Sequence, residues 1–428
     1  MSQQRKKKKI PPKKSDDLKI TKSVIDHYST VARKTLQILE LDPALFDQFT
    51  KKQKMVMMQL QFSTPKVLAH SGHDVPKRYL RTIQREMYDF TKRTYVGDPS
   101  IGLLYYDYLS IGLTFNTFFT RKKNIPAGLD QTDAYFLIAD RLKQKDDELN
   151  QFMNTYGNYV RYVTLFLSKL NFRVYGFTWE YNLTNNCRNL EQHLMITSAE
   201  PERIYFTYQQ KSRPAYRLIM GSYLSDNPIL VSLPYNEVFK SSNKTHFLKV
   251  YVQTHALKRL QERLDTRLSF YRYSALTQSI LNCEMVTNQL GQLLFACRDL
   301  SEHLLGYFPF TIEGDHLYIL SFLPLVSPKV PEGKLLCETL NTNKEDLIFL
   351  GMDKLSFYKN TDFDKVTILK EALIKSNMWH LTEIPFEEND TGEHAATNVA
   401  MLNRFFQHNV SDPGKDKVLE EIAEMIEQ

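Results

Sequence analysis

The residue pattern of this chain changes at Phe172, from apolar residues at helical spacing to runs of aromatic and β-branched residues. Between residues 18 and 170 the apolar positions follow the period of a helix, which predicts a series of helices with a break near Gly157. The segment 172–179 is typical of a strand, because aromatic and β-branched side chains pack well on a pleated surface. The pattern therefore predicts an α+β fold, in which a helical N-terminal region precedes antiparallel sheets with segregated helices.

The same pattern predicts four parts along the chain. They are a disordered basic arm (1–17), a mainly α-helical domain (18–171), a β-rich segment (172–245) and an α+β domain (246–428). The predicted helices of the second part are 18–39, 43–60, 76–95, 101–119 and 130–170. The predicted strands are 172–179, 204–208, 216–220, 229–231, 246–252, 293–298, 307–312 and 317–323. Later helices are predicted at 254–268, 273–286, 364–377, 398–406 and 417–426.

The positive charge of the chain is concentrated in its basic arm. The chain has 55 lysines and arginines against 49 acidic residues, a net charge of +6. Seven of the basic residues stand in the first fourteen positions, with no acid among them: Arg5, Lys6, Lys7, Lys8, Lys9, Lys13 and Lys14. The remaining 48 basic and 49 acidic residues leave a net charge of −1, so the excess charge belongs to the arm. We expect this arm to attract nucleic-acid phosphates, whereas the rest of the chain is not uniformly basic.

Several classes of protein and site are disfavoured by the motifs. The four cysteines include no Cys-x-x-Cys pair, which argues against a zinc site and is typical of a reducing compartment. The apolar stretch 100–119 contains Asp107, Ser110 and Asn116, so it predicts a buried helix rather than a membrane span. No glycine-rich phosphate loop is present, and no catalytic motif of the common hydrolases or zinc proteases. The expectation is a cytoplasmic protein without a cofactor, a metal or a membrane partner.

One helix carries the clearest group of chemically active side chains. The predicted strand 246–252 is followed by Thr254-His255-Ala256-Leu257-Lys258-Arg259-Leu260-Gln261-Glu262-Arg263-Leu264. At the helical period, four polar side chains share about a quarter-turn of the surface, while leucines occupy the other side. The candidate catalytic residues are His255, Arg259, Glu262 and Arg263. An imidazole transfers protons near neutral pH and guanidinium groups hold phosphate, so this face suits metal-free RNA cleavage. A solvated face with internal ion pairs explains the same residues without any chemistry.

This segment resembles a known domain family. A strand, then Thr254-His255-Ala256 with Arg259, Glu262 and Arg263, then a second helix and antiparallel strands is similar to the small DUF4258 domains. Those domains are similar in architecture to the RelE-like toxin fold, many of whose members cut RNA on ribosomes. The resemblance covers residues 246–325 and implies a RelE-like core there. It implies a fold more than an activity, because catalytic residues vary across RelE-like proteins.

Two functions from different classes follow. The first is an RNA-associated protein that uses the basic arm and the His/Arg helix face, either as a divergent metal-free ribonuclease or as an inactive relative. In that case Arg298, His303 and His316 are candidates to join His255 in one cleft; the alternative, which is more common for such histidines, is that each is bonded within the fold or lies at the surface. The second is a non-enzymatic interaction or structural protein, whose helical region binds a protein partner and whose lysine tail increases solubility. A pair of histidines, His70 and His73, is a weaker candidate for metal binding, since a metal needs further ligands from elsewhere in the chain.

Deleting residues 1–14 tests the role of the basic arm. We expect weaker binding of RNA and a flatter dependence of that binding on salt, because fewer phosphates are neutralised. The melting temperature should stay nearly unchanged, since the arm is predicted to lack a packed structure. Fluorescence anisotropy with labelled RNA and thermal melting curves measure the two effects. A large fall in melting temperature would show that the arm is packed against the folded chain.

Overall fold

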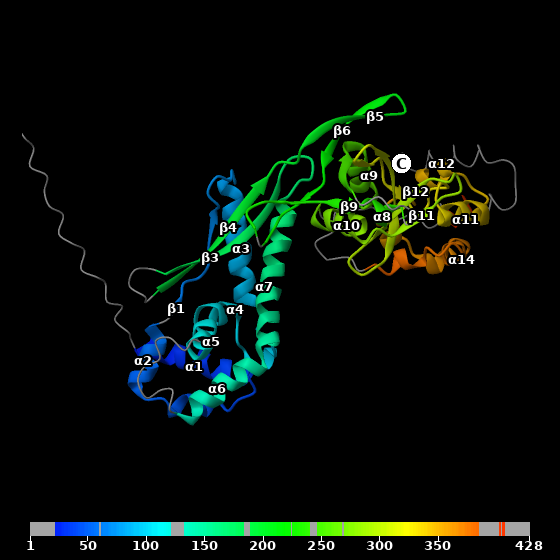
Figure 1. The fold of residues 1–428 in the computed structure, drawn as a ribbon. Helices are drawn as coiled ribbons and strands as arrows, with labels where there is room; N and C mark the ends of the chain where they lie inside the picture. Colours follow the sequence, from blue (N-terminus) through cyan, green and yellow to red (C-terminus); the bar gives the residue numbers. More distant parts are fainter. Residues whose placement is uncertain are drawn as a thin grey trace, which may run out of the picture. The chain divides into compact units, whose positions relative to one another are not determined.

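The computed structural model describes residues 22–59, 61–120, 132–183, 189–223, 225–239, 246–267, 269–384, 402–403 and 405–406 (Figure 1). The predicted basic arm, with Arg5 and the six lysines, lies outside these residues, as does the predicted helix 417–426. The described residues form an α+β fold, as the sequence predicts. They divide into two compact units that interleave along the chain. The first lies within Met1–Lys66, Gln84–Gly157 and Glu180–His193, and the second within Val67–Ile83, Asn158–Trp179 and Leu194–Gln428.

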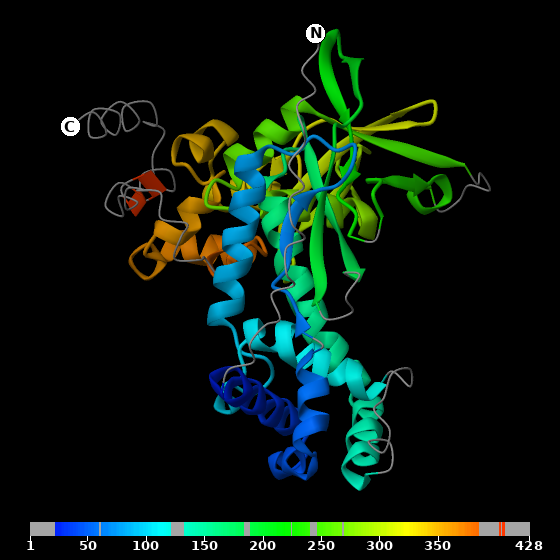
Figure 2. The ribbon, with the colours of Figure 1, turned by 90° about the vertical axis from the view of Figure 1, so that its left-hand side faces the viewer.

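The first unit is mainly helical. It contains α1 (Lys22–Ile38), η1 (Pro43–Gln48), α2 (Lys51–Gln59), β1 (Gln61–Phe62), η2 (Pro99–Ile101), α4 (Tyr105–Asp107), a π-helix (Tyr108–Gly112), α5 (Leu113–Thr120) and α6 (Asp133–Gln144). Its core is rich in aromatic rings, with Phe46 in contact with Tyr28 at 6.3 Å and with Phe115 at 6.2 Å between ring centroids. All three rings are fully buried. Figure 2 shows these helices, in blue and cyan, grouped together.

Five elements run from one unit into the other along the chain. They are β2 (Lys66–Ala69), α3 (Lys77–Arg93), α7 (Asp146–Leu167), β3 (Val174–Leu183) and β4 (Asn189–Ala199). The predicted break near Gly157 is wrong, because Gly157 lies inside α7. The predicted helix 130–170 is instead divided into α6 and α7 at Lys145. This residue is the C-terminal cap of α6, and its Nζ lies 2.7 Å from a carboxylate oxygen of Glu40. Three acidic residues then open α7, where carboxylates favour the positive end of a helix. The strands β1 and β2 also fall within the segment predicted as mainly helical.

A nine-stranded sheet organises the second unit. Its strands follow the order β11-β12-β13-β14-β10-β6-β5, with β15 paired to β13 and β9 paired to β10. Their bounds are β5 Arg203–Tyr208, β6 Lys211–Arg217, β9 Ser232–Pro234, β10 Phe247–Gln253, β11 Met285–Thr287, β12 Leu293–Arg298, β13 Leu304–Glu313, β14 His316–Ile319 and β15 Leu323–Pro324. A separate ribbon pairs β7 (Ile219–Met220) with β8 (Ile229–Leu230), and the short α8 spans Tyr235–Val238. The sequence Glu313-Gly314-Asp315 is typical of a tight turn, and Gly314, between β13 and β14, has the positive φ of 61° that such turns need.

The central pair of strands differs from the antiparallel prediction. β10 and β14 run parallel, with Lys249 opposite His316 and Val252 opposite Ile319. Two helices and three strands separate β10 from β14 in the chain, which gives the long connection that parallel strands need. Most of the other pairs in the sheet are antiparallel, as predicted.

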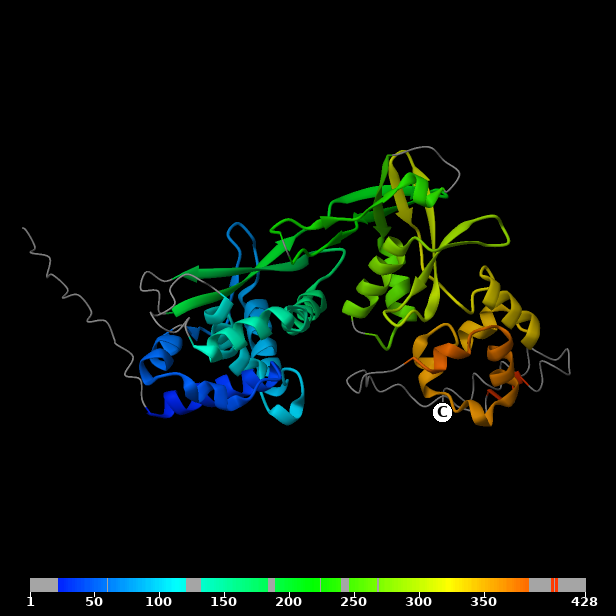
Figure 3. The ribbon, with the colours of Figure 1, turned by 60° about the horizontal axis from the view of Figure 1, so that its bottom comes forward.

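Helices of the second unit share one hydrophobic core with this sheet. The core includes Leu248, Val250 and Val252 of β10 together with buried residues of α9 (Thr254–Arg263) and α10 (Ser269–Asn282). The C-terminal helices join the same core: α11 Pro331–Leu340, α12 Lys344–Phe349, α13 Leu355–Asn360, η4 Phe363–Lys365, α14 Thr367–Lys375 and η5 Trp379–Thr382. Figure 3 shows these helices, in orange, gathered beside the sheet. Among the described residues, no helix combines the length and the apolar composition needed to cross a membrane.

Candidate functional site

The helix α9 begins directly after the central strand β10. A threonine directly after a strand is typical of an N-cap, but Thr254 is the first helical residue, and Gln253 occupies the cap without a side-chain capping bond. The hydroxyl of Thr254 donates to the carbonyl of Pro214 on β6 at 3.1 Å, which attaches the start of the helix to the sheet. Ala256 and Leu260 are buried against the core. The helix is therefore held at its start and along one side, and its remaining side chains have fixed directions.

Three of the predicted site residues lie on the exposed face of α9. Arg259 Nη1 donates to Glu262 Oε2 at 3.0 Å, and Lys258 Nζ lies 3.7 Å from Glu262 Oε1. The exposed fractions of these side chains are 40% for Arg259, 35% for Glu262 and 74% for Lys258. His255 lies one turn before Arg259 and is half-buried. The predicted grouping of His255, Arg259 and Glu262 on one face thus matches their positions.

His255 is surrounded by positive charge. Its partial burial lowers the pKa of the imidazole from the ordinary 6.5, and the charges of Arg213 and Arg259 lower it further. Glu262 acts in the opposite direction with a smaller effect than either arginine. The imidazole is therefore mainly neutral at pH 7 and offers one nitrogen as a proton acceptor.

Arg213 was not among the sequence candidates. The pattern predicts a polar loop over 209–214, but the structure continues β6 back to Lys211 and leaves a turn of Gln209 and Gln210. Both turn residues have positive φ, 47° and 63°, which suits the tight turn of a hairpin. Arg213 is thereby placed on a strand next to α9. The residues 211–215 show no regular apolar alternation, so the sequence carries no clear signal that points to Arg213.

Arg263 points away from the other three residues. Its Nη1 forms an ion pair with Asp353 Oδ2, and the exposed fractions of the two side chains are 13% and 2%. Burial raises the pKa of the Asp353 carboxyl, and the charge of Arg263 opposes that effect. The polar face of α9 therefore lacks the second arginine that the sequence places on it.

The other histidines belong to different parts of the second unit. His316 faces Lys249 near the start of β10, whereas His255 follows the end of that strand at Gln253, about 13 Å further along. His303 Nδ1 lies 3.1 Å from Asp299 Oδ2, which also accepts from the Tyr271 hydroxyl at 2.7 Å. The structure thus puts His303 in a cluster with Asp299 and places His316 at the far end of β10. The predicted cleft that joins His316 to His255 is wrong.

Arg298, the remaining residue of the predicted cleft, lies at the end of β12 and is hydrogen-bonded to Glu284 and Glu302. Its Nε and Nη2 donate to the two carboxylate oxygens of Glu284 at 2.6 and 2.8 Å, and its Nη1 donates to the Glu302 carbonyl. Such a bidentate pair fixes the guanidinium in place.

The two histidines considered for metal binding bond to other partners. His73 Nδ1 lies 3.1 Å from the backbone nitrogen of Ser198, and His70 Nε2 lies 3.3 Å from Asp226 Oδ1. Across the described part of the chain, no group of three histidine, cysteine or acidic side chains is arranged to hold a metal ion.

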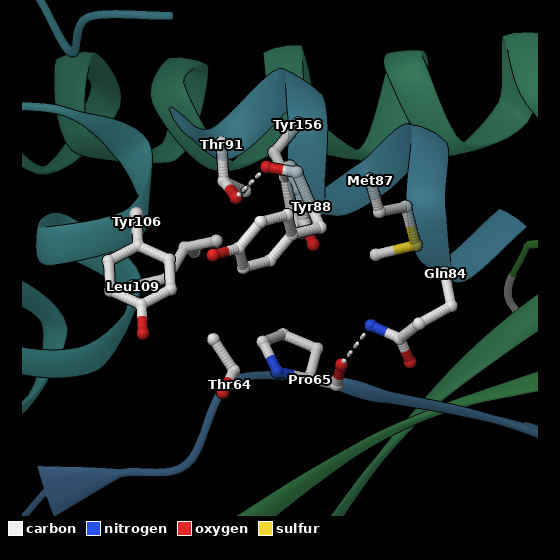
Figure 4. A pocket seen from close by; sticks show the side chains of 9 residues that line it. All are labelled: Thr64, Pro65, Gln84, Met87, Tyr88, Thr91, Tyr106, Leu109 and Tyr156. Carbon is white, nitrogen blue, oxygen red and sulfur yellow. Dashed lines mark hydrogen bonds between the residues drawn. The ribbon is translucent and has the colours of Figure 1, made fainter. Parts of the chain in front are cut away.

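A small cavity in the first unit is shown in Figure 4. Its volume is about 20 Å³, close to the space of a single water molecule. It is lined by Thr64, Pro65, Gln84, Met87, Tyr88, Thr91, Tyr106, Leu109 and Tyr156. The Gln84 amide donates to the Pro65 carbonyl at 3.2 Å, and Lys92 covers the Tyr106 ring at 3.2 Å from its centroid. This cavity is too small for an organic ligand.

Comparison of the chain with models of protein families, with curated proteins and with solved structures finds no match in any of the three. The site is therefore interpreted from its own geometry.

The buried pair of Arg263 and Asp353 predicts a large effect on stability. We expect Asp353→Ala to lower the free energy of unfolding by about 3–5 kcal/mol, because it leaves a buried guanidinium without its counter-charge. Lys258→Ala, on the exposed face of the same helix, should change it by no more than about 0.5 kcal/mol. Chemical denaturation measures both. Equal effects of the two substitutions would show that the pair contributes nothing particular to the fold.

Proposed function

We propose that this protein binds single-stranded RNA through the exposed face of α9 and the adjoining strand β6. The observation that carries the proposal is the cluster of Arg213, Lys258 and Arg259 around the half-buried His255. Arg213, Arg259 and Lys258 each act on His255 with a positive charge and Glu262 acts with a negative one, so positive charge predominates around this imidazole. Phosphates are attracted to such a surface by charge alone, and guanidinium groups bind them with two hydrogen bonds.

The ion pair between Arg259 and Glu262 does not prevent this binding. Both side chains are more than a third exposed, and exposed ion pairs of this kind contribute about 0–1 kcal/mol to the stability of the fold. A phosphate group offers Arg259 a stronger, bidentate partner. The arginine can therefore exchange Glu262 for an RNA phosphate at little cost.

The hairpin of β5 and β6 adds an aromatic component. Tyr208 stands opposite Lys211, and Phe206 stands opposite Arg213, so these four side chains share one face of the hairpin. Tyr208 has 36% of its surface exposed. Phe206 is buried against Tyr318, so Tyr208 is the ring of this pair that an unpaired base can stack on, which favours single-stranded RNA over a duplex.

RNA binding also agrees with the family resemblance stated for residues 246–325. The chain order of β10, α9, α10, β12, β13 and β14 follows the strand, two helices and antiparallel strands that the resemblance implies. The neutral imidazole of His255 suits the acceptance of a proton from a ribose hydroxyl. Cleavage also requires a group that protonates the leaving oxygen, and the described side chains of this face supply only cations and the paired Glu262. We therefore propose binding as the function, and RNA cleavage would be an addition to it.

A protein partner for the helical region is the second candidate. The observation that favours it is a pair of neighbouring apolar side chains on α6, Phe136 and Leu137, which are 60% and 48% exposed. Such side chains are compatible with a docking contact, but they do not identify the partner.

Substitutions at the cluster test the RNA proposal. We expect Arg213→Gln and Arg259→Gln each to weaken binding of a labelled single-stranded RNA by roughly threefold or more, because each removes a phosphate contact. Each should also flatten the plot of log affinity against log salt by about 0.7, the contribution of one contact in a single strand. Fluorescence anisotropy over a salt series measures both effects. The matched control is Lys375→Gln, an exposed lysine at the end of α14, which should behave as the unsubstituted protein. Absence of RNA binding at low salt, or arginine variants identical to the control, contradicts the proposal.

The low pKa of His255 predicts how RNA binding depends on pH. In the free protein the imidazole is neutral above its lowered pKa, and RNA phosphates favour its protonated form. Binding of RNA therefore takes up a proton, so the affinity should rise as the pH falls from about 7.5 to about 5.5. His255→Gln should remove most of this rise while leaving the affinity at about pH 8 unchanged. A pH profile that is the same in the variant would show that His255 does not face the phosphates.

A further inference from the structure

The hairpin of β5 and β6 presents a second aromatic ring, Tyr205, in the middle of β5. Tyr205 is 66% exposed, the largest exposed fraction of any phenylalanine, tyrosine or tryptophan that the structure describes. It stands opposite Pro214 of β6, and the carbonyl of Pro214 accepts the hydrogen bond from Thr254 at the start of α9. The ring therefore lies beside the first turn of the helix that carries His255 (Figure 1).

The register of the sheet places Tyr205 on the face that α9 covers. Arg203 pairs with Tyr216 of β6, and Tyr216 pairs with Val252 of β10, so these three residues form one row on one face. Val252 belongs to the core against which α9 packs. Tyr205 comes two residues after Arg203 and projects from the same face, whereas Tyr208 projects from the other face. Tyr205 thus flanks α9 on the side of the hairpin.

Arg203 fixes the orientation of the Tyr205 ring. Its guanidinium carbon lies 5.0 Å from the centroid of that ring, and its Nη2 donates a hydrogen bond to the Tyr205 hydroxyl. Glu202, the acid next to Arg203 in the chain, projects from the opposite face, where it accepts a hydrogen bond from the Tyr251 hydroxyl at 2.8 Å. Arg203 is itself exposed, so the pair combines a flat ring with a cation at the surface.

We propose that Tyr205 stacks against a base of the bound RNA and that Arg203 lies at the neighbouring phosphate. This proposal rests on the RNA binding proposed above, and it adds that the site binds the nucleobase as well as the charged backbone. The ring is held by the strand and by Arg203 before RNA arrives, so little freedom is lost when a base stacks on it. Every base has a flat face, so this contact tolerates any sequence but requires an unpaired base.

One strand of RNA can contact both exposed rings of the hairpin. β5 is the last of the described strands in the order of the sheet, so its outer edge leads directly from one face to the other. Tyr205 and Tyr208 are three residues apart, which corresponds to about 10 Å along β5. A single strand that crosses this edge meets Tyr205 beside α9 and Tyr208 on the other face. A duplex keeps its bases paired and stacked, so it offers neither ring a partner.

A strand without bases tests the proposal on the full chain. Labelled oligouridylate is compared with a ribose-phosphate strand of the same length that carries no bases, by fluorescence anisotropy over a salt series. We expect the unsubstituted protein to bind the abasic strand at least about fivefold more weakly, because stacking is lost while the charge is kept.

Tyr205→Ala should weaken the binding of oligouridylate by about fivefold or more and reduce the difference between the two strands. The dependence on salt should stay the same, because no phosphate contact is removed. The matched control is Phe247→Ala, which removes a ring that is 61% exposed at the far end of β10 and should leave the affinity unchanged.

Tyr205→Trp reports the contact directly. An indole keeps the stacking surface, so this variant should bind oligouridylate as tightly as the unsubstituted protein. The unsubstituted protein, which contains Trp179 and Trp379, supplies the background fluorescence. The additional fluorescence of the variant should be quenched by oligouridylate and not by the abasic strand.

The two proposals fail in different ways. If the protein binds oligouridylate and Arg259→Gln weakens it, but Tyr205→Ala behaves as Phe247→Ala or the abasic strand binds equally well, stacking is overturned and RNA binding stands. If the unsubstituted protein binds neither strand at low salt, RNA binding is overturned, and the stacking contact with it.

Discussion

The packing of α9 against the central strand β10 is the contact on which the proposed RNA-binding surface depends. β10 contributes Leu248, Val250 and Val252 to the core, and Ala256 and Leu260 of α9 pack into the same core. The helix starts at Thr254, directly after the strand, so no flexible connection allows it to rotate. Because Ala256 and Leu260 face the core, His255 and Arg259 must face outward. One apolar contact thus fixes the outward direction of His255 and Arg259.

The arginines of the second unit differ in role according to their burial. Arg217 is 5% exposed and donates through Nη1 to the carbonyls of Val231 and Val250, so its charge is used to join neighbouring strands. Burial lowers the pKa of this guanidinium but leaves it charged at any ordinary pH. Arg263 likewise forms a largely buried ion pair with Asp353 within the fold. Arg259 instead pairs with Glu262 at the surface, and Arg213 is half-buried beside His255. The number of basic residues in a segment therefore overstates the charge that it presents to RNA.

The sequence predicts the elements around α9 well and the contacts between distant segments poorly. The strand at 293–298 and the start of α9 at residue 254 agree with the prediction, since long apolar runs and a clear helical period leave little ambiguity. The strand β4 was not predicted, because the buried Gln192 interrupts the alternation of Leu190, Leu194 and Ile196. Gly157 was taken for a break, although a helix tolerates one glycine. The grouping of His255, Arg259 and Glu262 follows from spacing alone. The pairing of Arg263 with Asp353 does not, because the two residues meet only through the tertiary fold.

The direction of Arg263 shows why helical spacing alone was insufficient for the site. Around the axis of α9 it lies about 80° from His255 and only about 20° from Ala256, which is buried. A side chain at such a boundary turns inward when a buried partner of opposite charge is present and outward when none is. Asp353 supplies that partner, and its burial makes the pair structural rather than available to a ligand. Glu262 lies on the other side of His255, about 100° from Arg263, and remains at the surface with Arg259. The polar face is therefore narrower than its sequence suggests, and it is the addition of Arg213 from β6 that restores a second guanidinium beside His255.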